Sequence, residues 1–231
     1  MNQLMVGDIV TQYPAAADVL KSYRIDFCCG GNRPLLDVVN EMGLSADAVL
    51  RDILAVIAQP VGVQEGLTDW TKLNYSELID HIVKNHHEYL RRTLPELAQY
   101  TLTIRDVHGY LHPELAEVNR LFMTMRDELM LHLPKEELEM FPAIMKLDHH
   151  PTAVQVEQCK QLIEALEDEH EACGVILKQI RALTNDYEIP EDACPTYQIT
   201  FHKLQELEAD LFQHIHLENN ILFPRVSQQI A

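Results

Sequence analysis

Apolar residues recur at helical spacing through most of the chain after Trp70, in long segments that contain little glycine. This periodicity predicts amphipathic helices. The expected helices span 74–107, 112–147, 152–184 and 196–226. The breaks between them carry turn-forming residues, namely Gly109 with Pro113, Asp148 to Pro151, and Asn185 to Pro195. No alternating run of β-branched residues indicates a strand. Four long helices with short connections predict an all-α fold, an up-down four-helix bundle.

The N-terminal segment 1–58 shows a different pattern, in which short apolar runs are broken by turn residues. Pro14 and Pro34 each precede such a run, and proline is favoured in the first turn of a helix. Glycines at positions 30, 31 and 43 interrupt the runs. We therefore predict a small helical N-terminal domain over 1–58. The stretch 59–69, with two Gly, one Pro and weak periodicity, is predicted to be a linker, which leaves 70–231 for the bundle.

An internal repeat relates the second and fourth expected helices. Both contain the pattern H-x3-E-x4-F-P, and its two copies begin at His132 and His214. Two further histidines, His87 and His170, lie on the first and third helices and are separated by almost the same interval as the two copies. Matching residues at matching offsets predict that the bundle is a doubled helical hairpin.

The four repeated histidines are expected at one level of the bundle. His87 lies as many residues before the end of its expected helix, at position 107, as His132 lies after the start of the next helix, at position 112. Both histidines therefore stand roughly 30 Å from the turn that their helices share. His170 and His214 likewise fall at similar heights above the break between the third and fourth helices. Independent core histidines would have no reason to align, so a common site is predicted.

The spacing within each repeat supplies carboxylates beside the imidazoles. Glu136 and Glu218 each lie four positions after a histidine, which places both side chains on one stripe, about 40° apart. A mixed nitrogen and oxygen shell without thiolates suits iron or manganese better than structural zinc. Four histidines, two bridging carboxylates and one oxo or hydroxo bridge would fill about ten of the roughly twelve positions around two octahedral ions. About two positions would stay open, as a reactive centre requires.

Other residues compete for the same roles. Glu128 and Asp210 lie four positions before the repeated histidines, on the same stripes as the chosen glutamates. His86 adjoins His87, about 100° around the helix, and could replace it. Glu137 is about 140° from the first repeated histidine and is expected to face elsewhere.

Bulk composition excludes several classes of function. The net charge is −18, from 36 acidic and 18 basic residues, and such a surface repels nucleic acid and anionic membranes. No apolar run is long enough to span a membrane, and the N-terminus lacks a signal-peptide pattern, so we expect a cytoplasmic location. Five cysteines without disulfide-framework spacing fit a reducing compartment. The sequence allows a homodimer without indicating one.

At this point the chain resembles a known family, the RIC proteins for the repair of iron centres, whose members are called YtfE, ScdA and DnrN. The segments that carry the resemblance are RIDFCCGG, HHEYLRRTLPEL, HLPKEELEMFP, EDEHEACGV and HIHLENNILFP. They cover nearly the whole chain in the family's order. The sequence departs at Arg24, where a glycine is common, and at the additional His86.

The resemblance implies a hemerythrin-like bundle with a non-haem di-iron centre, two iron ions bridged by carboxylates and an oxo or hydroxo group. Carried over by motif, the ligands would be His87, His132, Glu136, His170, His214 and Glu218. The resemblance also implies the restoration of iron–sulfur clusters damaged by nitric oxide or oxidants. The implied partners are iron–sulfur proteins with damaged clusters, and the small ligands are nitric oxide or O2.

The adjacent pair Cys28-Cys29 is the second candidate for chemistry. Neighbouring cysteines chelate one metal ion poorly and form only strained disulfides. Their position before Gly30-Gly31, near an expected helix start, would lower a thiolate pKa. The resemblance implies a role in passing iron, redox equivalents or nitric oxide.

Three functions compete at this stage. Cluster repair by iron donation ranks first, because a simple gas carrier has no need of two adjacent thiols. The alternatives are an enzyme that reduces nitric oxide at the di-iron centre and a reversible sensor of O2 or nitric oxide.

Overall fold

Helices make up almost all the regular structure of this chain. The computed structural model describes residues 4–58, 68–147 and 152–230. Within those ranges there is no β-strand, only an isolated antiparallel bridge between Met5 and Pro34. The predicted all-α fold is confirmed. The chain divides into two compact units, Met1–Leu78 with Phe212–Ala231, and Ile79–Leu211.

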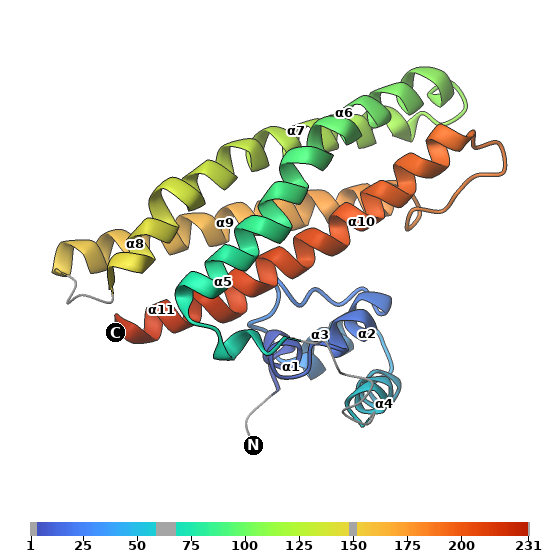
Figure 1. Cartoon of the computed structure of the whole chain (residues 1–231). Helices are drawn as coiled ribbons and strands as arrows, with labels where there is room; N and C mark the ends of the chain where they lie inside the picture. Colours follow the sequence, from blue (N-terminus) through green and yellow to red (C-terminus); the bar gives the residue numbers. More distant parts are fainter. Residues whose placement is uncertain (1–3, 59–67, 148–151, 231) are drawn as a thin grey trace. The chain divides into compact units, whose positions relative to one another are not determined.

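The unit Ile79–Leu211 is built on four long helices. They are α6 (Glu88–His108), α7 (Glu114–Lys135), α9 (Ala153–Leu183) and α10 (Pro195–Leu217). Only the part of α10 up to Leu211 belongs to this unit. Figure 1 shows α6 and α7 lying along each other, and α7 also packs on α9. Since only residues 109–113 join α6 to α7, these helices run antiparallel. The predicted four-helix bundle is confirmed.

Shorter stretches extend the long helices. The first expected helix comprises α5 (Tyr75–His81), the π-helical η3 (Ile82–His87) and α6, after the 3-10 turn η2 (Trp70–Lys72). The second comprises α7, the π-helical η4 (Glu136–Met140) and α8 (Phe141–Lys146), and the fourth comprises α10, the π-helical η6 (Glu218–Leu222) and α11 (Phe223–Gln229). The expected boundaries agree to within a few residues. The π-helical turns were not predicted.

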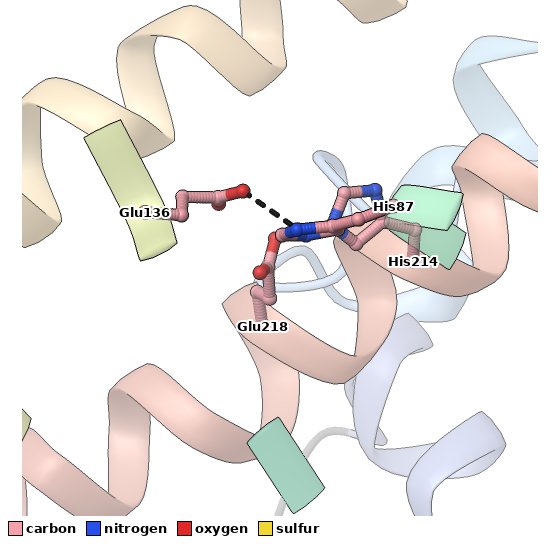
Figure 2. Close-up of side chains that lie close together, drawn as sticks. All are labelled: His87, Glu136, His214 and Glu218. Carbon is pink, nitrogen blue, oxygen red and sulfur yellow. Dashed lines mark ion pairs between the residues drawn. The ribbon is translucent and has the colours of Figure 1, made fainter. Parts of the chain in front are cut away.

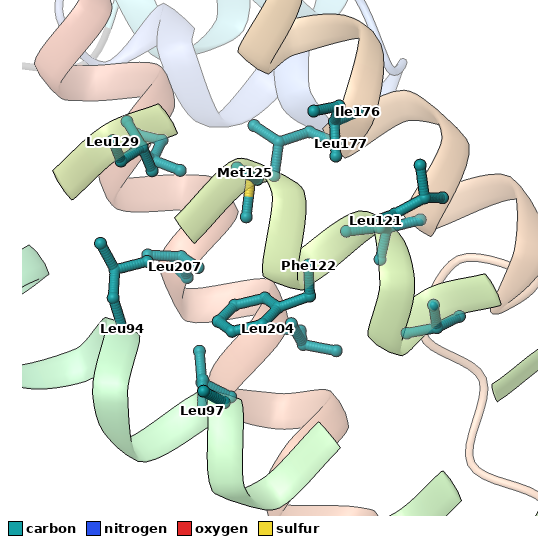
Figure 3. Close-up of a cluster of buried hydrophobic side chains, with 14 of the residues drawn as sticks. Leu94, Leu97, Leu121, Phe122, Met125, Leu129, Ile176, Leu177, Leu204 and Leu207 are labelled. Atoms are coloured by element: carbon teal, nitrogen blue, oxygen red, sulfur yellow. The ribbon is translucent and has the colours of Figure 1, made fainter. Parts of the chain in front are cut away.

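The core of the bundle consists of leucines and other large apolar side chains repeated at helical spacing. Figure 3 shows side chains of α6, α7, α9 and α10 meeting around Phe122, which is fully buried. Its labelled neighbours include Leu94, Leu97, Leu121, Met125, Leu129, Ile176, Leu177, Leu204 and Leu207. Burial of this apolar surface provides the main stabilisation of the unit.

A charged pair joins α9 and α10 beyond this core. The Arg181 guanidinium donates to Glu208 through Nη2 at 2.6 Å and Nε at 3.0 Å, and Glu208 is buried. The chain then leaves α9 through three non-glycine residues in the left-handed region, 185–187 (φ 47°, 65° and 60°). That conformation is costly for side chains with a Cβ. Thr184 helps to hold it, because its hydroxyl accepts the Tyr187 backbone N–H.

The N-terminal helices belong to the other unit. They are α1 (Val6–Gln12), α2 (Ala16–Ser22), α3 (Leu35–Glu41) and α4 (Ala46–Ile57), and they confirm the predicted short helices. Gly43, with φ +66°, turns the chain after α3, where a residue with a Cβ would be strained. The apolar cluster of these helices includes Phe212 and Ile215 from the end of α10. The domain boundaries at 58 and 70 stay predictions, and residues 59–67 of the predicted linker lie outside the described residues.

Among the described residues, no helix is long and apolar enough to cross a membrane.

Candidate metal centre

The first donors of the site come from the junction of α7 and η4. His132 lies in the last turn of α7, and Glu136 is the first residue of η4. Their spacing of four positions brings His132 Nε2 to 3.0 Å from Glu136 Oε1. Both side chains are buried. The predicted common stripe therefore exists in the first repeat.

The dipeptide Phe-Pro follows the π-helical turn after each glutamate. Pro142 has no N–H for an α-helical hydrogen bond, and its ring would press on the carbonyl four positions earlier. A π-helical turn relieves this conflict by admitting one extra residue. The Phe141 N–H accordingly donates to the carbonyl of Glu136, five positions back. The second repeat has the same arrangement, with the Phe223 N–H donating to Glu218.

His87 and His170 approach Glu136 from two other helices. His87 ends the π-helical turn η3 and is fully buried, with Nε2 3.3 Å from Glu136 Oε2. His170 lies on α9, with Nε2 3.7 Å from Glu136 Oε1 and 3.0 Å from His132 Nε2. Three imidazoles thus present Nε2 to a single carboxylate.

The second repeat contributes the remaining pair. His214 lies in the last turn of α10, and Glu218 opens η6. His214 Nε2 lies 3.2 Å from Glu218 Oε2, and both side chains are buried. The geometry of the first repeat is therefore reproduced in the second.

The potential ligand atoms form two overlapping groups. One group contains His87, Glu136, His214 and Glu218, and the other contains His132, Glu136, His170 and Glu218. Within each group, the potential ligand atoms lie within 4.8 Å of one another. Figure 2 shows the carboxylates of Glu136 and Glu218 directed toward the imidazoles of His87 and His214. The two glutamates belong to both groups. The structure therefore brings all six predicted residues together, with the carboxylates in the shared positions.

The chemistry of this donor set fits a metal pair. Burial opposes ionisation of Glu136, but the charge of His132 and hydrogen bonds from His132, His170 and His87 hold the pKa of Glu136 well below its usual range. Glu136 and Glu218 are both 0% exposed, and buried carboxylates require opposite charge nearby. Metal binding requires neutral imidazoles, and two carboxylates beside neutral imidazoles leave a net negative charge that cations would balance. No thiolate lies in either group, which disfavours a structural zinc site.

Two further carboxylates orient the histidines from outside. His87 Nδ1 lies 2.7 Å from Glu137 Oε1, which also accepts from Arg91 at 2.7 Å. His132 Nδ1 lies 2.8 Å from Glu169 Oε2, and Lys135 donates to the same carboxylate. Carboxylates that accept the Nδ1–H fix the ring orientation and leave Nε2 for a metal.

The electrostatics of the outer carboxylates agree with this role. Burial raises the pKa of Glu137, but hydrogen bonds from His87 and Arg91 outweigh it and lower the pKa overall. The pKa of Glu169 is lowered in the same way, by Lys135 and His132 against the effect of burial. Glu137 lies in neither group of potential ligands, but its carboxylate holds His87 from outside the site.

The competing candidates lie outside both groups. Glu128 is exposed. Asp210 instead accepts from His86 Nδ1 at 2.9 Å, so these two alternatives pair with each other.

The cysteine pair forms a third, separate group with Asp26. The Sγ atoms of Cys28 and Cys29 lie 3.7 Å apart, and Cys28 Sγ donates to Asp26 Oδ1 at 3.2 Å. The expected fall in thiol pKa does not occur at Cys28. Burial, a hydrogen bond with Cys29 and the negative charge of Asp26 raise the pKa of Cys28 well above its usual value. The next helix, α3, begins only at Leu35, so no helix N-terminus stabilises a thiolate here.

Comparison with known proteins gives the chain two matched regions. Residues 78–226 match the Hemerythrin HHE cation binding domain, and residues 2–57 match ScdA_N, a Domain of Unknown function (DUF542). The iron-sulfur cluster repair protein ScdA of Staphylococcus haemolyticus is 33% identical over 98% of this chain and 99% of its own length. ScdA of Staphylococcus epidermidis (strain ATCC 12228) is 35% identical, covering 96% and 97%. The iron-sulfur cluster repair protein YtfE of Escherichia coli O81 is 32% identical, covering 95% and 94%. The chain therefore belongs to the ScdA/YtfE family, in which a ScdA_N domain precedes a hemerythrin-like, metal-binding domain.

Proposed function

We propose that this protein repairs damaged iron–sulfur clusters by supplying iron from a labile pair of iron ions. The proposed ligands are His87, His132, Glu136, His170, His214 and Glu218. The observation that carries the proposal is that two fully buried glutamates are shared between two groups of imidazoles. The names of the relatives, iron-sulfur cluster repair proteins ScdA and YtfE, support the choice of function.

The side chains of the site have distinct tasks in this proposal. The four imidazoles offer Nε2 as neutral donors, and Glu137 and Glu169 hold two of them in the required tautomer. Glu136 and Glu218 supply negative charge between the metal positions. Two bound iron ions would provide exchangeable iron and open positions for small ligands.

Removal of either shared glutamate tests the ligand set. Glu136→Ala and Glu218→Ala should each lose more than half of the bound iron, with helical circular dichroism preserved, because each change removes a donor from both groups. Glu128→Ala is the matched control and should keep its iron. Unchanged iron content in both glutamate variants would contradict the proposed site.

Iron transfer tests the repair function itself. Iron-loaded protein is mixed, under reducing conditions and with inorganic sulfide supplied, with an iron–sulfur protein whose cluster has been destroyed by nitric oxide. We expect iron to pass to the acceptor and its cluster absorbance to return. Iron that stays on the donor while the acceptor remains inactive would refute donation.

The predicted open positions favour one competing function, the reduction of nitric oxide. Nitric oxide supplied with a reductant should then give catalytic nitrous oxide. Stoichiometric or no nitrous oxide would remove this alternative. Spectra that return fully after the gas is removed, without loss of iron, would favour a reversible sensor instead.

A further inference from the structure

One amide side chain connects the cysteine pair to the helical turn that carries Glu218. Asn220 is the third residue of η6, two positions after Glu218. Its Nδ2 donates to the carbonyl of Phe27 at 3.3 Å and to the carbonyl of Cys28 at 3.0 Å. The carbonyl of Cys28 belongs to the peptide bond between Cys28 and Cys29. Asn220 therefore fixes the orientation of the peptide that separates the two thiols.

The surrounding backbone is shaped to admit this amide. A Cβ added at Gly7 would lie 2.8 Å from Asn220 Cγ, and one added at Gly31 would lie 2.9 Å from the same atom. Real Cβ atoms do not approach so closely, so both glycines keep space for the side chain. The Gly7 N–H donates to the Gly31 carbonyl at 2.8 Å, which holds the two glycines together around Asn220.

The other side of the cysteine loop is held by Asp26. Its Oδ1 accepts the backbone N–H groups of Cys28, Cys29 and Gly30 at 3.0–3.2 Å. The loop is thus fixed through its N–H groups by Asp26 and through its carbonyls by Asn220. Of these two attachments, only Asn220 lies on the turn that begins with Glu218.

We propose that Asn220 is a positioning residue that couples the metal centre to the reactivity of Cys28 and Cys29. Metal binding fixes Glu218 and with it the short turn η6. The Asn220 amide then holds the Cys28–Cys29 peptide in one orientation, and the thiols become less accessible to reagents. Loss of metal frees the turn and the peptide together. This inference rests on the proposed function only in requiring that Glu218 be a metal ligand.

The experiment compares thiol alkylation with and without metal. Iron-loaded protein and chelator-treated protein react with iodoacetamide, and mass spectrometry gives the rates at Cys28 and Cys29. In the wild type, we expect the loaded form to react about fivefold more slowly, since coupling between sites is commonly at least of this size. Asn220→Asp keeps the size of the side chain but replaces its two donors by an acceptor, so the two rates should become equal. Asn219→Asp, in the same turn, is the matched control and should keep the wild-type ratio.

The other possible results of this experiment also contradict or support the coupling through Asn220. A wild-type ratio of one, or an unchanged ratio in Asn220→Asp, would overturn the coupling. Gly7→Ala, which crowds the amide without removing it, should also bring the ratio toward one. Loss of iron from both variants with intact helices would overturn the proposal too, because Asn220 would then be only a support of the metal site. Iron content of the wild type and of Glu218→Ala tests the proposed function separately from these rates.

Discussion

At the scale of single residues, the carboxylates behind the histidines are as informative as the donors in front of them. Glu137 lies against His87, and Glu169 lies against His132, each with a basic side chain on its far side. A histidine held in this way keeps its Nε2 directed inward before any metal arrives. The cost of ordering the ligands is then met during folding, which strengthens metal binding.

Neutralising one of these carboxylates should weaken metal binding. Glu137→Gln keeps the shape and an acceptor oxygen but loses the negative charge that makes His87 more basic. We expect iron affinity to fall about tenfold, the lower end of the effect of such partners, as measured by competition with a coloured chelator. Glu139→Gln, an exposed carboxylate in the same turn, should have no effect. Equal affinities for the two variants would show that Glu137 has no such role.

The raised pKa of Cys28 predicts an unusual pH dependence of its alkylation. An ordinary thiol, with a pKa of about 8.5, is mostly thiolate by pH 9.5. Burial and the charge of Asp26 raise the pKa of Cys28, so its rate in the folded protein should still be rising at pH 9.5. The same residue in guanidinium-unfolded protein should already have levelled off. Asp26→Asn, which removes the charge but keeps an acceptor, should shift the folded profile to lower pH. Coincident folded and unfolded profiles would contradict this account.

The six donors could be predicted from the sequence, but their outer partners could not. His132, Glu136, His214 and Glu218 stand in a repeated pattern, and repetition separates them from incidental residues. Glu137 and Glu169 belong to no such pattern. Their roles depend on contacts between helices, which the period of a single helix does not specify. The pKa of Cys28 was mispredicted for a similar reason, since its burial depends on packing among distant segments.

At the scale of elements, the helices followed from apolar periodicity, but the π-helical turns did not. The hydrophobic period averaged over a long segment does not reveal one extra residue in a single turn. The extra residue does change which side chain faces inward over the next few residues. All three π-helical turns of the described chain adjoin candidate ligands, namely His87, Glu136 and Glu218.

Removing the proline after one of these turns should alter the metal site without unfolding the helix. In Pro142→Ala, residue 142 regains an N–H and can close an α-helical hydrogen bond, which favours an ordinary turn in place of η4. Glu136 should then shift, and bound iron should fall below half of the wild-type amount, while the melting temperature stays the same or rises. Pro95→Ala, in the interior of α6 away from any π-helical turn, is the control. Full iron content in Pro142→Ala would show that the turn does not depend on the proline.

At the scale of the whole molecule, the proposed ligands come from distant parts of the chain. They begin at His87 and end at Glu218, so an unfolded chain cannot present them together. Metal binding should therefore stabilise the folded state. At a free metal concentration of about 100 times Kd, the gain is about 2.7 kcal/mol. For a chain of this size, the melting temperature should rise by roughly 5–10 °C.

Calorimetry of metal-free and iron-loaded protein measures this gain. The double variant Glu136→Ala with Glu218→Ala should show no rise when iron is added. A rise of equal size in the double variant would mean that iron binds elsewhere.

The pair between Arg181 and the buried Glu208 has a consequence for movement along the bundle. If α9 slid past α10 by one helical turn, about 5.4 Å, the guanidinium and the carboxylate would be separated, and the buried Glu208 carboxylate would lose this partner. Such isolation of opposite charges costs several kcal/mol. Sliding is therefore blocked, and any rearrangement of these two helices must proceed by bending or local fraying.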